Sequence, residues 1–207
     1  MKKVFLCSIA LCLSVLVFAQ RHASILKSEA PLTWLGLDFS QASFTGSSGQ
    51  YGDIGEVTDD QVLEKYIPAW NLLFVNEEKK YDVAKYLDRG AVTYALDVTT
   101  KANNKNYPST IFSDDPGRFQ HLNKSDVGRL VGKYNFLDHK GTGVLFFIEG
   151  MSKGKEMVSA WVVFVDMDTK TVLQSAQITG RAGGIGFRNY WAKGYLNILK
   201  DVSSRMR

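Results

Sequence analysis

The stretch Gly143–Thr179 constrains the fold more than any other part of the chain. It holds three runs of strand length, at Gly143–Glu149, Val158–Asp166 and Thr171–Thr179, with two turn-prone segments between them. The first two runs are apolar on both alternating faces, and a strand without a polar face must be covered on both sides. The third run alternates apolar with polar residues, which is typical of a half-exposed or edge strand. The stretch therefore predicts a three-stranded antiparallel meander.

Helices are expected on both sides of this meander. Thr58–Gln61 matches a capping box, in which a Thr side chain and a Gln side chain bond the first free amides of a helix. We expect that helix to run from Asp59 to about Val75 and to bend at Pro68. Near the end of the chain, apolar residues recur at steps of three and four over Phe187–Val202, which predicts an amphipathic helix.

Together these patterns predict an α/β (α+β) fold. We expect a single domain over residues 32–207, with a mixed sheet of about five strands that includes the antiparallel meander (143–179) and is flanked by helices, the C-terminal amphipathic helix among them. The remaining segments are assigned as strands at Leu32–Phe39 and Ala91–Val98, loops at Ser40–Val57 and Thr99–Pro116, and a helix that Ser125 caps.

The first 19 residues have the pattern of a signal peptide. Lys2 and Lys3 precede the apolar run Val4–Phe18, and cleavage is expected before Gln20. An uncleaved anchor is the alternative, although the run is shorter than the roughly 20 residues of a spanning helix. Residues 20–31 are expected to be a flexible lead-in. The pattern predicts a periplasmic or extracellular location, with no transmembrane segment once the leader is removed.

Cysteine usage and charge exclude several functions. Both cysteines, Cys7 and Cys12, lie in the expected leader, so the mature chain would have no disulfide, no thiolate metal site and no catalytic thiol. Removing the leader leaves 23 basic against 21 acidic side chains. A chain this close to neutral gives no support to nucleic-acid binding, which needs a concentrated basic face.

The segment Arg181–Arg188 is the most suggestive one for a ligand. It joins a strand to a helix, and glycines let an anion approach the backbone amides at a helix start. The competing interpretation is that the glycines only turn the chain. If a small ligand binds, we expect it to be anionic and to contact Arg181, Gly183, Gly184, Gly186 and Arg188.

Four carboxylates, at Asp38, Asp97, Glu149 and Asp166, fall at or near the ends of expected strands. Two of them brought together could carry out acid–base chemistry or bind a cation. The alternative is that they are solvent-exposed turn formers, as the hairpin sequence after Asp166 indicates. The chain has three histidines that share no local motif, so we expect no catalytic residue, no metal and no cofactor.

Three segments resemble known protein families. Phe164–Ser175 resembles a hairpin in the small α/β domains of bacterial envelope lipoproteins, such as the TolB N-terminal type and the activators of penicillin-binding proteins. Gly143–Glu149 and Gly183–Trp191 resemble a family of uncharacterised exported α/β proteins of Gram-negative bacteria. The resemblance implies an envelope protein that binds another protein or a cell-wall component. This chain lacks the lipid-bearing cysteine of the lipoproteins.

From these observations we expect a secreted or periplasmic, non-catalytic envelope protein whose partner is another envelope protein or a wall component. The alternative is a hydrolase or transferase in which strand-end carboxylates meet in a cleft. An enzyme should have a deep pocket where two of these carboxylates converge with a base or donor. A binding protein should instead have a flat apolar patch or an open sheet edge.

Overall fold

The computed structural model describes residues 30–46 and 57–206. The expected leader (1–19) and most of the expected lead-in (20–31) lie outside these residues. In chain order the elements are β1 (Leu32–Asp38), β2 (Ser43–Thr45), α2 (Asp59–Gln61), η3 (Val62–Tyr66), α3 (Ile67–Asn76), α4 (Val83–Tyr86), β3 (Val92–Tyr94), α5 (Leu96–Asn106), β4 (Phe112–Ser113), η4 (Pro116–Phe119), α6 (Lys124–Lys133), β5 (Thr142–Ser152), β6 (Met157–Asp166), β7 (Thr171–Arg181) and α7 (Phe187–Arg205).

Strand β5 lies at the centre of a seven-stranded sheet. It pairs in parallel with β1 through residues 142–147 and with β2 through residues 150–152, so that β1 and β2 follow one another along the same edge of β5. Outside them, β3 pairs with β1 and β4 pairs with β2, again in parallel. On its other edge β5 pairs antiparallel with β6, which pairs antiparallel with β7.

The predicted fold is therefore wrong in its sheet. We expected about five strands organised by an antiparallel meander over 143–179, whereas the sheet has seven strands and its core pairings among β1 to β5 are parallel. Antiparallel pairing is confined to β5–β6 and β6–β7. Two strands of the parallel part were missed because β2 and β4 have only three and two residues. Strands this short carry no alternation that a sequence pattern can reveal.

Two further assignments were wrong because they did not include the helix α5. Ala91–Val98 is a strand only at Val92–Tyr94, and α5 begins at Leu96, inside the segment that alternation assigned to the strand. The expected loop Thr99–Pro116 contains most of α5 as well as β4. The sequence of α5 is rich in Thr and Asn, which have low intrinsic helix propensity. Its contacts with the sheet stabilise the helix instead.

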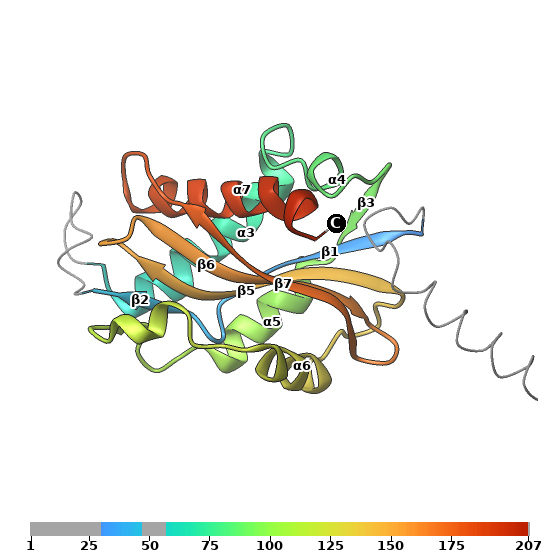
Figure 1. Cartoon of the computed structure of the whole chain (residues 1–207), viewed down its shortest axis with the longest axis horizontal. Coiled ribbons are helices and arrows are strands. Elements are labelled where there is room, and N and C mark those ends of the chain that lie inside the picture. Colours follow the sequence, from blue (N-terminus) through green and yellow to red (C-terminus); the bar gives the residue numbers. More distant parts are fainter. Residues whose placement is uncertain (1–29, 47–56, 207) are drawn as a thin grey trace, which may run out of the picture.

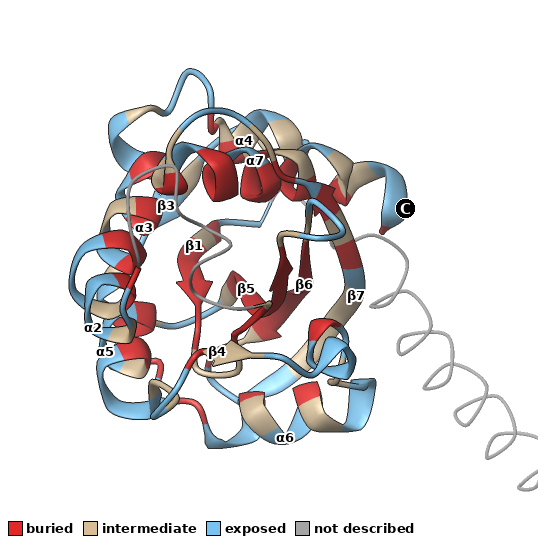
Figure 2. Cartoon of the chain, turned by 90° about the vertical axis from the view of Figure 1, so that its left-hand side faces the viewer, coloured by how far each residue is buried: buried red, intermediate tan, exposed pale blue. Residues whose placement is uncertain are grey.

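Helices cover both faces of the sheet (Figure 1). One face packs against α3 and α7 around Trp34, Trp70 and Trp191, and we call this cluster the α3–α7 core. The other face packs against α5 and α6 around Phe147 and Trp161, and we call it the α5–α6 core. In Figure 2 the buried residues lie on the central strands and on the helix sides that face them. Among the described residues, no helix has the length and apolar character that crossing a membrane requires.

The C-terminal end of β1 is hydrogen-bonded to β5 on one edge and to side chains of two helices on the other. Its pairing with β3 ends at Trp34, which leaves the following backbone groups on that edge without a strand partner. Unpaired buried backbone groups are costly, so polar side chains from α3 and α5 supply the missing bonds and fix this end of the strand. These bonds join Thr99 Oγ1 to Leu35 O (2.6 Å), Leu37 N to Asn71 Oδ1 (2.7 Å) and Phe39 N to Asn103 Oδ1 (2.7 Å).

Candidate functional site

The four strand-end carboxylates do not converge. Asp97 lies in the first turn of α5 and contacts His139 at 3.0 Å on the surface. Asp166 caps the turn after β6, where its Oδ1 accepts bonds from the amides of Asp168 and Thr169. Both are therefore surface or turn residues, as the simpler interpretation of the sequence had it.

Glu149 is fully buried in β5 on the side of the α5–α6 core. Its Oε1 accepts a bond from the amide of Leu122, and its Oε2 accepts bonds from Ser159 Oγ (3.1 Å) and Gln177 Nε2 (2.8 Å). A buried carboxylate with three donors is satisfied within the protein. It therefore joins the segment before α6 to β6 and β7, and does not contact a ligand site.

Asp38 is fully buried at the end of β1. Burial raises the pKa of its carboxyl, and hydrogen bonds from Ser40 and Tyr134 oppose that rise. The Tyr134 hydroxyl donates to Asp38 Oδ2 at 2.6 Å, and the amide of Ser40 donates to Oδ1 at 2.7 Å. Burial and the neighbouring Asp38 also raise the pKa of Tyr134 well above its usual value. Ionisable groups with shifted pKa values cluster at functional sites, which directs attention to this end of β1.

A groove with a volume of about 400 Å³ lies directly beside this pair, between α5, α6 and the end of β1. We call it the α5–α6 groove. Ligand sites in sheets with parallel strands lie outside the carboxyl ends of the strands, which is where this groove lies relative to β1. Its lining residues are Ser40, Gln41, Val98, Lys101, Ala102, Lys105, Asn106, Leu130, Lys133, Tyr134, Asn135 and Phe147.

The lining of the α5–α6 groove is apolar on its floor and basic on its rim. Lys101 and Lys105 are one helical turn apart on α5, and Lys133 is the last residue of α6. None of the three forms an ion pair within residues 30–46 and 57–206, and none of the groove's lining residues is acidic. The groove therefore offers three uncompensated positive charges.

A second hollow of about 360 Å³ continues from this groove and shares Gln41, Leu130 and Lys133 with it. It adds Arg129, which bonds Asp126 within α6, and His121, whose Nδ1 lies 2.8 Å from Arg118 O. Asp126 also lines this hollow and offsets the charge of Arg129, so the hollow extends the groove along α6 toward η4 without adding net positive charge. A ligand longer than a single small molecule could contact both hollows.

The predicted anion site is only partly assembled. Gly183, Gly184 and Arg188 line one groove of about 340 Å³ between the end of α3 and the start of α7, which we call the glycine-turn groove. Gly186 is the N-cap of α7, but it is not part of that lining. Arg181 contacts Glu156 at 3.0 Å and lies outside the groove as well.

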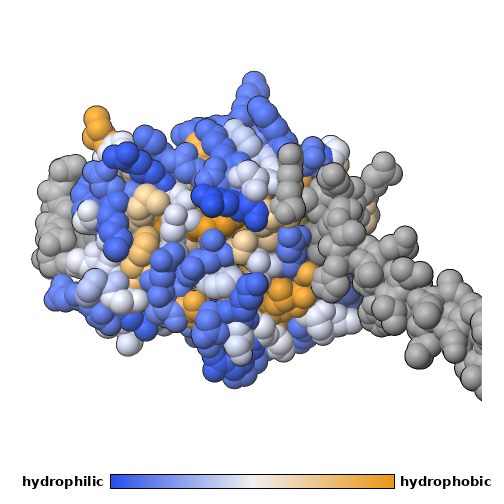
Figure 3. All heavy atoms as spheres, viewed as in Figure 1, coloured by the Kyte–Doolittle hydropathy of each residue, from blue (hydrophilic) through white to orange (hydrophobic). Residues whose placement is uncertain are grey.

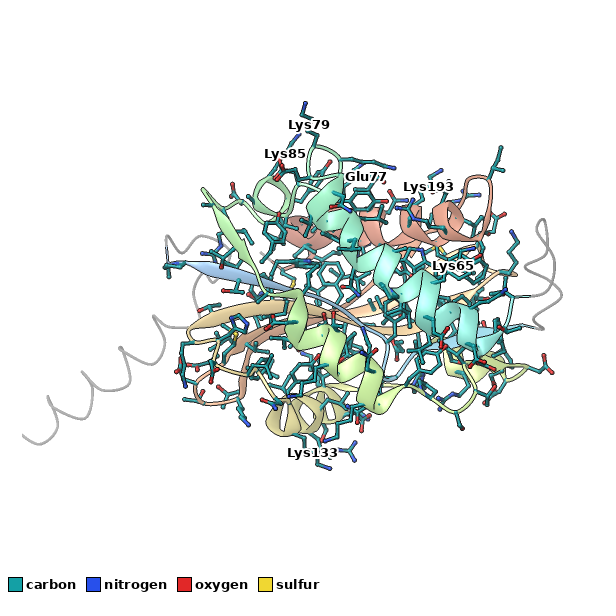
Figure 4. The ribbon with its side chains drawn as sticks, turned by 180° about the vertical axis from the view of Figure 1, so that it is seen from behind. Lys65, Glu77, Lys79, Lys85, Lys133 and Lys193 are labelled. Carbon is teal, nitrogen blue, oxygen red and sulfur yellow. The ribbon has the colours of Figure 1, made fainter. Side chains whose placement is uncertain are left out.

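Lysines that sequence reasoning did not connect with the turn complete the glycine-turn groove. Lys80, Lys193 and Lys200 line it together with Arg188, and Glu77 contributes the one acidic side chain in its lining. Glu77 lies 3.8 Å from the Lys80 ammonium and 3.6 Å from the Arg188 guanidinium. In Figure 4, Glu77 and Lys193 are seen on the same, upper side of the molecule, and Lys133 is on the opposite side. The groove has a net positive charge.

The described part of the chain holds no group of three or more His, Cys, Asp or Glu side chains arranged to bind a metal ion. A comparison with protein-family models, with curated proteins and with solved structures finds no match to this chain.

Proposed function

We propose that this chain is an exported, non-catalytic binding protein of the cell envelope, and that its α5–α6 groove binds an acidic segment of another protein. One observation carries the proposal: Lys101, Lys105 and Lys133 surround an apolar floor with no acidic residue in the groove's lining. Charges placed this way attract an acidic partner from a distance, and the apolar floor then gives the contact that holds it. The signal-peptide pattern of residues 1–19 supports the location.

The floor favours a peptide over a glycan. Ala102 and Leu130, which are both partly exposed, supply aliphatic surface that suits aliphatic side chains. The two aromatic residues of the lining, Tyr134 and Phe147, are only 8% and 0% exposed, so neither offers an open ring face on which a sugar could stack. The preferred ligand is therefore a peptide that alternates carboxylate with aliphatic side chains.

A hydrolase or transferase that uses strand-end carboxylates has less support. Asp38 and Glu149 are buried and bonded to protein donors, while Asp97 and Asp166 lie elsewhere on the surface. None of these four residues belongs to the lining of either groove. Tyr134, the ionisable group nearest to Asp38 in the α5–α6 groove, has a pKa raised far above neutral, so it cannot act as a base there.

The test is a binding titration with a labelled peptide of alternating Glu and Leu residues. The double variant Lys101→Glu/Lys133→Glu should bind at least about tenfold more weakly, and added salt should weaken wild-type binding. The double variant Lys79→Glu/Lys85→Glu makes the same change of charge at exposed sites far from Lys133 (Figure 4) and should bind like the wild type. An equal loss in both variants would mean non-specific attraction. Binding of an acidic glycan but not of the peptide would contradict the proposed ligand class.

Export is tested separately, by measuring the intact mass of the protein recovered from the periplasm or the medium. We expect a mature chain that starts at Gln20. A recovered species that retains Val4–Phe18 would contradict the proposed location.

We also propose that the glycine-turn groove is a second, smaller site for a phosphate or carboxylate. The support is that Gly183, Gly184 and Arg188 share one groove with three lysines. Arg188 can make a forked contact with an anion that lysine cannot reproduce. Phosphate should shift the amide resonances of Gly183 and Gly184 and bind Arg188→Lys more weakly. Unchanged amide resonances at millimolar phosphate would show that the turn is structural.

A further inference from the structure

The two edges of the sheet differ sharply in the length of open backbone. One edge is formed by β3 and β4, which have three and two residues. The other edge is β7, which has 11 residues and pairs only with β6 among the described strands. In Figure 1 β7 runs across the front of the molecule, and in Figure 2 it is the outermost strand on its side of the sheet. Very short edge strands limit unwanted pairing, so β3 and β4 are protected and β7 is not.

Strand β7 has only one of the other features that keep sheet edges from pairing, a bulge near its start. Between Val172 and Gly180 it has no proline and no charged side chain, although proteins commonly place Lys or Pro on an exposed edge. Its single irregularity is an extra residue, Leu173, near the start of the strand. Figure 3, in the same view as Figure 1, shows mostly polar and neutral surface on this side, with a few apolar patches. An edge with so little protection is more consistent with a strand that is paired in the functional state.

The protein holds β7 in position for such pairing. Gln174 Nε2 donates to Met206 O at the end of α7, and Gln177 Nε2 donates to the buried Glu149. Gly180 packs so closely on α7 that a methyl group there would lie 2.2 Å from Gly194 O. One face of β7 is thus anchored to α7 and the other to Glu149 on the side of the α5–α6 core. The outer backbone edge of β7 lies at the front of the molecule in Figure 1.

We propose that β7 is a dimer interface, at which two copies of this chain pair their β7 strands antiparallel about a two-fold axis near Ala176. An isologous interface requires a surface that is complementary to itself, and an uncharged edge strand meets this requirement. With this axis, Thr171 of one copy lies opposite Arg181 of the other. Arg181 is therefore placed beside the partner's β6–β7 turn, whose Asp166, Asp168 and Lys170 give it one net negative charge. The pairing joins the two sheets into one and involves neither groove.

Charge at the two ends of β7 favours a second copy over an unrelated extended segment. Arg181 pairs with Glu156 and has a side chain that is 75% exposed, and Asp168 pairs with Lys140 and has one that is 49% exposed. Exposed ion pairs are weak, so both side chains can exchange these contacts for one across the interface. In antiparallel self-pairing, this contact forms twice, once at each end. An unrelated strand would need its own matching charges at a spacing of one β7 length.

The first test measures molecular mass by light scattering over a range of protein concentrations. Wild type should form a dimer that dissociates on dilution. Ser175→Lys places two like charges near the axis, which should weaken the dimer at least about tenfold. Ser109→Lys makes the same substitution at an exposed position of the loop between α5 and β4 and should dimerise like the wild type. A wild type that is monomeric at every concentration would overturn the proposal.

A second test remains informative if Ser175→Lys folds poorly. Ala176→Cys places a thiol near the axis, so mild oxidation should link two copies through it. Wild type, which carries only the leader cysteines Cys7 and Cys12, and Ser109→Cys should not form that link. Equal linking of the Ala176→Cys and Ser109→Cys variants would indicate random collision, and capture of a different protein by β7 with no self-linking would also overturn the second-copy assignment. Neither result bears on peptide binding in the α5–α6 groove.

Discussion

At the scale of single residues, Asp38 positions its neighbours at a cost in stability. Its carboxylate is fully buried, and it orders the turn after β1 through Ser40 and one wall of the α5–α6 groove through Tyr134. A buried aspartate costs stability when it ionises, so Asp38 is better explained by the groove residues that it positions than by what it contributes to the core.

The raised pKa of Asp38 predicts a specific dependence of stability on pH. Because the folded protein holds the Asp38 proton more tightly than the unfolded chain does, Asp38 contributes most stability below about pH 3.9, the usual aspartate pKa. That contribution is lost as the pH rises through the folded-state pKa. Asp38→Asn does not titrate, so the free energy of unfolding of the wild type should fall relative to the variant as the pH rises above about 4. Chemical denaturation at several pH values measures this, and a constant difference would contradict the raised pKa.

Trp161 tests the packing on the same side of the sheet. It lies in the middle of β6 opposite Phe147 and is 6% exposed. Deleting a buried large aromatic ring leaves a cavity, so Trp161→Ala should lower the free energy of unfolding by about 3–5 kcal/mol. Trp161→Phe keeps most of the apolar contact and should cost clearly less. Urea denaturation of the three proteins is the measurement, and a loss below about 1 kcal/mol for the alanine variant would mean that the residue does not pack as described.

At the scale of elements, the sequence predicted those features that depend on residues close together in the chain, such as helix caps and amphipathic helices. The capping box at Thr58 and Gln61 is present, with both of its bonds. The amphipathic C-terminal helix is α7, Phe187–Arg205. The cap of α6 was misplaced, since Asn123 and not Ser125 accepts the first free amides, and Asp126 bonds back to the Asn123 amide. The spacing of Asn123 and Asp126 was the signal that could have identified it.

The α5–α6 groove could not be predicted, because α5 itself was not. Thr99 and Asn103 bond the backbone of β1 from α5, and these bonds between distant segments override a weak local preference for helix. With that segment assigned to a loop, nothing placed Lys101 and Lys105 on one face. The glycine turn before α7 could be recognised in the sequence because glycines and arginines are close together there. The lysines that line the same groove could not be connected with it, since Lys80 lies in the turn after α3, and Lys193 and Lys200 lie further along α7.

Close packing of α7 on the sheet gives a prediction at this scale. A methyl group at Gly180 would meet the backbone of α7, so Gly180→Ala must separate the helix from β7 and should lower stability by about 1–3 kcal/mol. Gly128→Ala is the matched control. Gly128 lies on the exposed side of α6 with open space around its Cα, where alanine should stabilise the helix by about 0.5–1 kcal/mol. Thermal or chemical denaturation of both variants should give shifts of opposite sign; a neutral Gly180→Ala would contradict the close contact.

At the scale of the whole molecule, the two cores share one central strand. The side chains of β5 alternate between them, with Val144 and Phe146 in the α3–α7 core and Leu145 and Phe147 in the α5–α6 core. If β5 unfolds, the apolar side chains of both cores become exposed, because alternate residues of the same strand belong to each core. The described residues are therefore expected to unfold as one cooperative unit, as the single domain predicted for residues 32–207 requires.

The four tryptophans allow this cooperativity to be measured. Trp34, Trp70 and Trp191 lie in the α3–α7 core, while Trp161 alone lies in the α5–α6 core. In Trp161→Phe, fluorescence therefore reports on the α3–α7 core only, whereas far-UV circular dichroism also reports on α5 and α6. If both cores unfold together, the two signals should give the same urea midpoint and the same slope. Loss of α5 and α6 in a separate, earlier transition would shift the dichroism midpoint below the fluorescence midpoint. Since the walls of the α5–α6 groove are those two helices, that result would also mean that the proposed peptide site can open without unfolding of the rest of the molecule.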